Sequence, residues 1–296
     1  MEGNQVNIVE SITQTINNLF SNLFSSVDNS LYSVLDDLLF INADILNNKN
    51  FFNILGDSNS NGLIIICNSL LIGFFLYYLC TLILSYFTFS QIQKPAQFIF
   101  KFFLCAIAIN SSSFLIEKFI YFFSNISLSI REVGEIALGK DICLSTFIQD
   151  FNSSIYIEGI ALNIFSLTGL IKSFISIGLL NLSISYSIRY IMIRVFILLT
   201  PFAFSSLVST NTYWIFKSWF KILLSLLMLQ IFVSLILIVS FSLDINSTDM
   251  FSKLTYMGCI YSLIKCNSFV RDFMGGLSTD ISVGLSSFKN LFSNQC

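Results

Sequence analysis

The stretch from Gly159 to Ser209 constrains the fold of this chain more than any other. It contains 51 residues and only three charged side chains, those of Lys172, Arg189 and Arg194. A single straight helix of that length would measure about 76 Å at 1.5 Å per residue. That is more than twice the roughly 30 Å thickness of the hydrocarbon core of a bilayer. We therefore expect the stretch to fold back as a hairpin of two helices, with its turn in the polar segment Asn181–Ser187.

The composition places the whole chain among integral membrane proteins. Hydrophobic residues make up 55% of the 296 residues, charged residues make up 11%, and the mean hydropathy is +0.79. A soluble domain typically has about 25% charged residues, so this chain has too few charges to cover a globule in water. The net charge of -2 also argues against a broad basic surface for duplex DNA.

Five apolar runs are long enough to be membrane spans, and a weaker run at 254–264 fits either a short sixth span or a helix at the interface. We therefore expect an all-α fold, a polytopic transmembrane helix bundle of five or six spans. The predicted spans are 63–89, 98–116, 159–180, 186–208 and 222–243.

The N-terminal region differs from the spans because its apolar residues recur at helical spacing between many polar ones. It is too polar to cross a membrane, and it is acidic, whereas helices that lie on membranes usually carry Lys and Arg. Two interpretations stay open: a helix packed on its own bundle, or an arm that binds a partner. The expected division is an amphipathic acidic helical region at 1–61, a transmembrane domain at 62–274 with a polar segment at about 117–158, and an amphipathic tail at 275–296.

The residue types exclude several kinds of chemistry. The chain has no His, which removes histidine-based metal sites, nucleophile pairs and proton relays. Its seven Cys residues are scattered without a C-x-x-C motif, so we interpret most of them as small buried apolar side chains. With no phosphate-binding loop in the sequence either, we expect no catalytic residue, no cofactor and no metal, and therefore not an enzyme.

The three charges inside the apolar stretch need an explanation because buried charges are costly in lipid. Lys172 lies near the middle of a predicted span, where it either pairs with a neighbour or faces a polar path through an assembly. Arg189 lies at the expected end of a span and can extend its charge to the interface. Arg194 lies about 7.5 Å deeper at helical rise and can do so in part.

Two further residues inside spans are predicted to shape helix contacts. Pro201 cannot donate a backbone hydrogen bond, so the carbonyl of Ile197 loses its partner and the helix is expected to kink. Asn110 is followed by three serines, and such polar groups in a membrane are expected to face other helices.

The orientation follows from the distribution of Lys and Arg in short loops, which favour the cytoplasmic side. In its short loops, one side has the denser positive charge, from Lys94, Lys101, Arg189, Arg194 and Lys253. This predicts an external N-terminus and an external segment at 117–158. Residues Lys217 and Lys221 would then be external, which counts against the choice.

The run from Ser185 to Val239 has a distinctive order: a span that ends in an apolar-proline-apolar segment, a short polar loop, and a second span whose start carries tryptophans and lysines. This order resembles the VirB6/TrbL-like membrane subunits of type IV secretion and conjugation machines. The segments Lys101–Phe119 and Ile264–Gly276 also look similar, in the family's order. The matching positions in the main run are Arg189, Pro201, Trp214, Lys217, Trp219 and Lys221.

The resemblance implies a scaffold or channel component of the plasma membrane, which helps single-stranded DNA with its attached relaxase, or a protein, to cross. It also implies a homo-oligomer that works with VirB3-, VirB4- and VirB8-like subunits in the lipid bilayer, with energy supplied by separate ATPases.

Other functions stay open from the sequence alone. Lys172 and the polar residues from Asn110 to Ser113 inside predicted spans are compatible with a small-molecule or ion permease. An immunity or holin-like structural membrane protein is a further alternative, and a membrane-embedded enzyme is the least favoured.

Overall fold

The computed structural model describes residues 15, 34–41, 49–56, 62–89, 94–155, 167–243 and 250–274, and within these ranges every regular element is an α-helix. The expected all-α class is therefore confirmed for the described part of the chain. The helices are α2 (Lys49–Leu55), α3 (Leu63–Thr88), α4 (Pro95–Asn110), α5 (Ser112–Leu138), α6 (Leu144–Ile155), α7 (Leu167–Leu198), α8 (Thr200–Ser205), α9 (Tyr213–Ser242) and α10 (Met250–Met274).

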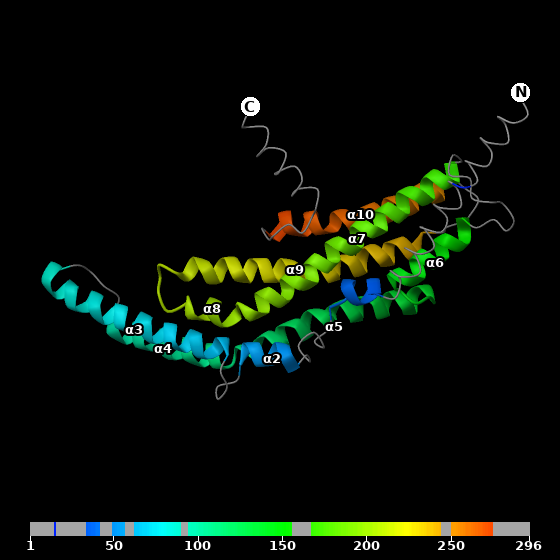
Figure 1. Ribbon diagram of the computed structural model, residues 1–296. Helices are drawn as coiled ribbons and strands as arrows, with labels where there is room; N and C mark the ends of the chain where they lie inside the picture. Colours follow the sequence, from blue (N-terminus) through cyan, green and yellow to red (C-terminus); the bar gives the residue numbers. More distant parts are fainter. Residues whose placement is uncertain are drawn as a thin grey trace, which may run out of the picture.

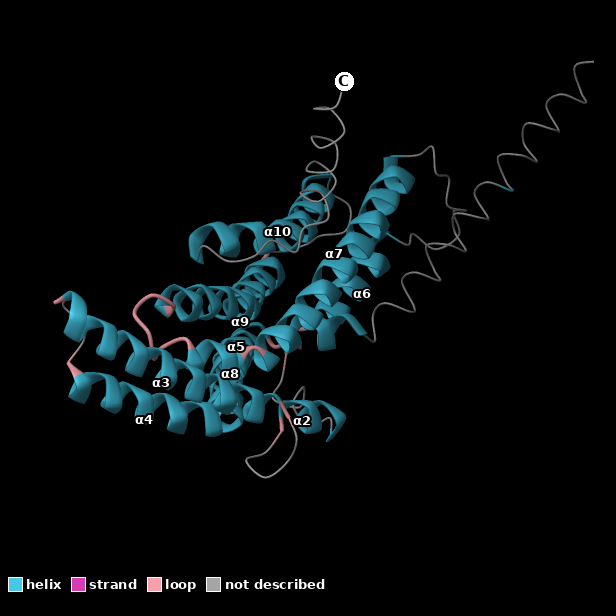
Figure 2. Cartoon of the chain, turned by 60° about the vertical axis from the view of Figure 1, so that its left-hand side comes forward, coloured by secondary structure: helices cyan, strands magenta, loops and turns pink. Residues whose placement is uncertain are grey.

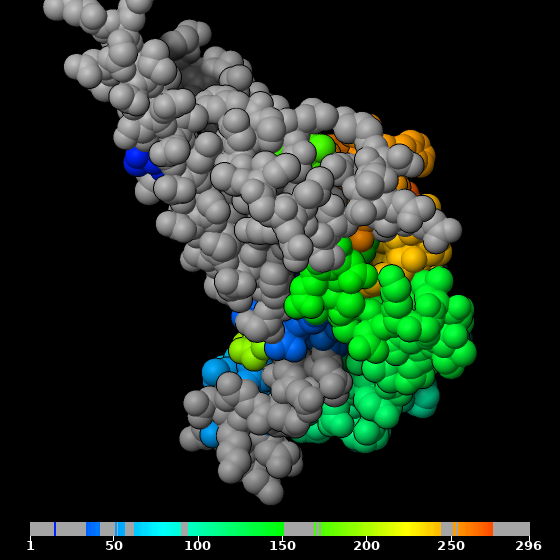
Figure 3. Space-filling model, turned by 90° about the vertical axis from the view of Figure 1, so that its right-hand side faces the viewer, coloured from blue at the N-terminus to red at the C-terminus, as the bar shows by residue number. Residues whose placement is uncertain are grey.

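Helix α9 forms the centre of the bundle, because α5, α7 and α10 all pack against it (Figure 1). From Ile222 onwards it is apolar apart from Gln230 and a few serines, as expected of a helix that is surrounded by neighbours or lipid. Its residues Val233 and Leu237 are fully buried in a core that also contains Leu179 and Leu182 of α7 and Leu263 of α10. Figure 3 shows the end of the bundle where α5 and α6 (green) lie beside α10 (orange).

The antiparallel pair α3 and α4 projects from the bundle to one side (Figures 1 and 2). The pair shares a small core with α8 and the residues directly after it, and in this core the rings of Tyr78 and Phe98 stack with centroids 3.7 Å apart. Towards the far end of α3 the large side chains are exposed: Phe87 is 79% exposed and Phe89 is 94% exposed. The far half of this hairpin therefore offers an apolar surface.

Among the described residues, fewer helices are long and apolar enough to cross a membrane than the sequence predicts. By length and composition, three described helices qualify, namely α3, residues 173–198 of α7, and α9. A fourth span results if α4 and α5, which are bent by 68° at Ser111, count as one broken span. The described part of the chain is thus all-helical with three or four helices that could span a membrane, while the expected five or six spans are not confirmed.

The predicted hairpin turn at Asn181–Ser187 is wrong, because α7 runs without interruption for 32 residues through that segment. Three of the polar residues there face inward and do not form a turn, since Ser183, Ser185 and Tyr186 are all buried. Tyr186 donates a 3.4 Å hydrogen bond from its hydroxyl to the Leu263 carbonyl of α10. The chain instead folds back after α7, between residues 199 and 212.

Residues 34–41 lie inside the bundle, and residues 34–39 of them are helical. Leu35 and Leu39 are fully buried in the same core as α7 and α9. The carboxylate of Asp36 accepts hydrogen bonds from the Leu144 N–H, at 2.9 Å, and from Ser145, at the start of α6. These residues therefore pack on their own bundle. The rest of 1–33, apart from residue 15, and the tail at 275–296 lie outside the described residues.

Candidate functional site around the α7–α9 turn and its buried arginine

Arg189 is the largest fully buried side chain among the described residues, and it is 0% exposed. Its Nε donates a 2.9 Å hydrogen bond to the Leu226 carbonyl of α9, and its Nη1 donates one of 2.9 Å to the Leu39 carbonyl. Leu39 is the last residue of a helical segment, where carbonyls have no helical partner. The Leu226 carbonyl can accept a second bond because it has two lone pairs.

The expectation that Arg189 reaches the membrane interface is wrong. The absence of a turn at Asn181–Ser187 leaves it well inside α7, and its charge is met by carbonyl dipoles of two other segments. The ion pairs found among the described residues lie elsewhere, for example between Lys140 and Asp150. A cation buried in this way is expensive unless it is well hydrogen-bonded, so its partners fix how the three segments meet.

A second set of polar groups lies in the same core. The side chain of Gln230, one helical turn beyond Leu226 on α9, is fully buried, and neither its Nε2 nor its Oε1 has a hydrogen-bond partner among the described residues. One turn further, the hydroxyl of Ser234 lies 2.8 Å from that of Ser127 on α5. The interior of the bundle is thus not purely apolar. Sequence analysis did not single out Gln230, although it is the only Gln inside the apolar run of α9.

Arg194 lies between aromatic rings. Its Nη2 donates a 2.6 Å hydrogen bond to the hydroxyl of Tyr190, whose ring centroid is 4.6 Å from the guanidinium carbon. The ring of Phe51 on α2 lies 5.9 Å from the same carbon. Cation–π contact of this kind stabilises a cation that has lost part of its water, so Arg194 ties α2 to α7.

Pro201 lies in the first turn of α8, directly after the single-residue break that ends α7. Proline is favoured in the first turn of a helix, where its missing N–H would have no partner. The sequence predicts a kink at this residue. In the structure, α7 ends just before it and the new short helix α8 starts. Trp219 closes the block, because its indole Nε1 donates a 2.9 Å hydrogen bond to the Phe196 carbonyl near the end of α7.

The six positions that carry the family resemblance fall into three environments. Arg189 lies in the core, and Pro201 and Trp219 are buried at the break between α7 and α9. The other three, Trp214, Lys217 and Lys221, are exposed on the first turns of α9. Both tryptophans stand close together in the sequence, at the start of the second span. Their spacing of five residues nevertheless turns them to different sides of the helix.

Asn110 ends α4 at the bend. Its Nδ2 donates a 2.8 Å hydrogen bond to the Ala106 carbonyl, and its Oδ1 accepts one of 3.2 Å from Asn68 on α3. This is a contact with another helix, of the kind that the sequence predicts. The side chain of Lys172 lies outside the described residues, so both of its proposed roles stay predictions.

No group of three or more Cys, Asp or Glu side chains in the described ranges is arranged to hold a metal ion. A scan against models of protein families and a search of curated proteins found no match to this chain.

Proposed function

We propose that this protein is a polytopic subunit of the plasma-membrane complex of a type IV secretion or conjugation machine, similar to the VirB6/TrbL-like subunits. In this role it is a scaffold or channel component through which a DNA–protein or protein substrate crosses. It has no catalytic activity of its own.

The observation that carries the proposal is the α7–α8–α9 block. Two helices that are long and apolar enough to cross a membrane are joined by a short helix that has Pro201 in its first turn and by a polar turn. The bond from Trp219 to the Phe196 carbonyl fastens the start of α9 to the end of α7. The order of these parts is the order on which the family resemblance rests.

The distribution of charge supports a scaffold more than a chemical site. The buried charge of Arg189 is bonded to backbone carbonyls from two segments, which holds helices together. The exposed charges of Lys217 and Lys221 lie at the end of the α7–α9 block, where they are free to contact other subunits.

The partners that we propose are other copies of the chain and VirB3-, VirB4- and VirB8-like subunits. The N-terminus is proposed to be external. The orientation rule counts Lys and Arg residues in short loops. Arg189 is buried inside α7, so its charge is not counted for the orientation.

The experiment is an in-frame deletion of the gene in a donor cell that carries it, with the wild-type gene restored in trans. We expect DNA or protein transfer to recipients to be lost on deletion and to recover on complementation. Normal transfer by the deletion strain would refute the proposal. Solute movement by the purified protein in liposomes, together with normal transfer, would favour a permease instead.

A further inference from the structure

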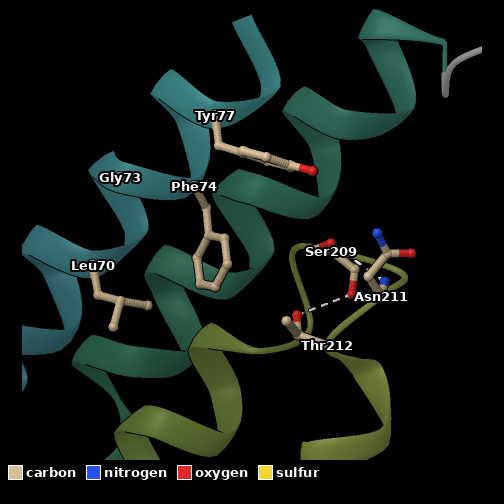
Figure 4. Close-up of a pocket in the computed structure, with 7 residues that line it drawn as sticks. All are labelled: Leu70, Gly73, Phe74, Tyr77, Ser209, Asn211 and Thr212. Atoms are coloured by element: carbon tan, nitrogen blue, oxygen red, sulfur yellow. Dashed lines mark hydrogen bonds between the residues drawn. The ribbon is translucent and has the colours of Figure 1, made fainter. Parts of the chain in front are cut away.

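A cavity of about 460 Å³ lies between α3 and the turn that joins α8 to α9 (Figure 4). One wall belongs to α3 and the other to the turn. This volume lies within the range of small-molecule pockets in proteins. The lining residues are Leu70, Gly73, Phe74 and Tyr77 on α3, and Ser209, Asn211 and Thr212 on the turn.

The α3 wall is apolar and open towards the surroundings of the protein. Its residues recur at spacings of three and four, which places them on one face of the helix. Leu70 is 39% exposed and Tyr77 is 59% exposed, and α3 is one of the candidate spans. At Gly73 the wall is hollow, because a Cβ there would have no atom within 4 Å. This face can therefore take an acyl chain along its length.

The turn wall is polar, and part of its hydrogen-bonding capacity is unused. Thr212 donates its hydroxyl to the Ser206 carbonyl, at 2.8 Å, so it does not cap α9, which has no side-chain cap. The carboxamide of Asn211 makes no hydrogen bond to any described residue. This wall therefore offers donors to the oxygen atoms of a ligand.

An apolar wall beside a polar wall fits an amphiphilic ligand, which has an apolar chain and a polar headgroup. We propose that the cavity binds one phospholipid molecule, with an acyl chain along Leu70, Gly73 and Phe74 and the glycerol-phosphate group at Asn211 and the first turn of α9. Trp214 and Lys217, which are exposed on the same turns of α9, are of the types that favour the lipid headgroup level. Lys217 adds positive charge nearby, so an anionic headgroup is preferred. This inference does not depend on the proposed function.

Gly73 allows a sharp test, because a side chain at this position fills the cavity without meeting protein atoms. The full chain is purified in mild detergent, phosphatidylglycerol is added, and the lipid retained per protein is counted by native mass spectrometry. The wild type is expected to keep one molecule. Gly73→Leu is expected to retain it roughly tenfold more weakly, because leucine takes the space of a few methylene groups.

Gly258 on α10 provides the matched control, since a Cβ there also has no atom within 4 Å. Gly258→Leu should retain phosphatidylglycerol like the wild type. Gly73→Ala, which favours the helix, should show an intermediate loss. Asn211→Ala should lower the retention of phosphatidylglycerol more than the retention of phosphatidylcholine. Equal retention by the wild type, Gly73→Ala, Gly73→Leu and Gly258→Leu would overturn the site, and unchanged retention in Asn211→Ala would overturn the headgroup placement.

Discussion

Arg189 donates a hydrogen bond to the carbonyl of Leu39, a residue that precedes it by 150 positions in the chain. The same guanidinium bonds the Leu226 carbonyl of α9. One side chain thus joins the described N-terminal segment, α7 and α9.

Arg189→Met should destabilise the protein by about 1–3 kcal/mol, because the Leu39 carbonyl is left buried without a partner. The loss should appear as a lower thermal midpoint in detergent and as faster proteolysis near residues 34–41. Arg194→Met is the comparison, and it should cost less, because Arg194 is only half-buried and its guanidinium donates to the hydroxyl of one side chain, Tyr190. An equal or larger cost at Arg194 would show that the carbonyl contacts of Arg189 contribute little.

Asp36→Ala should lower the free energy of unfolding by about 0.5–2 kcal/mol, the usual cost of losing a helix cap. The carboxylate accepts bonds from Leu144 and Ser145 at the start of α6. Hydrogen exchange in the first turn of α6 should increase. Its exposed neighbour Asp37 serves as the control, and Asp37→Ala should change neither quantity. The same exchange rates in both variants would contradict the cap.

Cys143 should react slowly with thiol reagents. Burial, and then the nearby negative charge of Asp36, raise the pKa of its thiol above the ordinary value. Because the thiolate is the reactive form, the labelling rate of a variant with Cys143 as its single cysteine should keep rising as pH increases beyond 9. Asp36→Asn removes a charge that disfavours the thiolate, so it should speed labelling at a fixed pH near 8. A rate that is unchanged by Asp36→Asn would exclude that electrostatic contribution.

The same single-cysteine variant tests orientation. If the segment at 117–158 is external, an impermeant maleimide should label Cys143 on intact cells, slowly but to completion at high pH. Labelling only after the cells are opened would reverse the proposed orientation.

Trp219→Phe should cost about 1 kcal/mol of stability or somewhat more, because the ring is kept while the hydrogen bond to the Phe196 carbonyl is lost. Trp214→Phe should cost little, since Trp214 is 65% exposed. Thermal unfolding of the two variants in the same detergent gives the comparison. A larger loss at Trp214 would mean that Trp219 does not fasten α9 to α7.

Pro201→Leu should impair assembly or transfer more than membrane insertion. Leucine restores an N–H that can bond the Ile197 carbonyl, which favours continuation of α7 into α8 and displaces the turn. The measurements are the amount of protein in the membrane fraction and the transfer frequency of the donor cell. Wild-type transfer by the variant would remove the functional role that we propose for this proline.

The sequence predicted the helices best where apolar residues run without interruption. The run at 63–89 matches α3 and the run at 222–243 matches the later part of α9, each to within one residue at its end, because a long apolar segment in lipid must satisfy its backbone internally. The prediction from the sequence failed where polar residues interrupt an apolar run. The polar segment Asn181–Ser187 was predicted to be a turn, but Ser183, Ser185 and Tyr186 are buried in one continuous helix.

By itself, then, the sequence determined that the chain is helical and apolar enough for a membrane, and that a helix is disturbed at Pro201. Only the tertiary structure decided where the charges of Arg189 and Asp36 lie, because their partners are backbone groups of distant segments. A carbonyl or an N–H is present at almost every residue, so composition carries no signal of which one will be left free by a helix end and reached by a distant side chain.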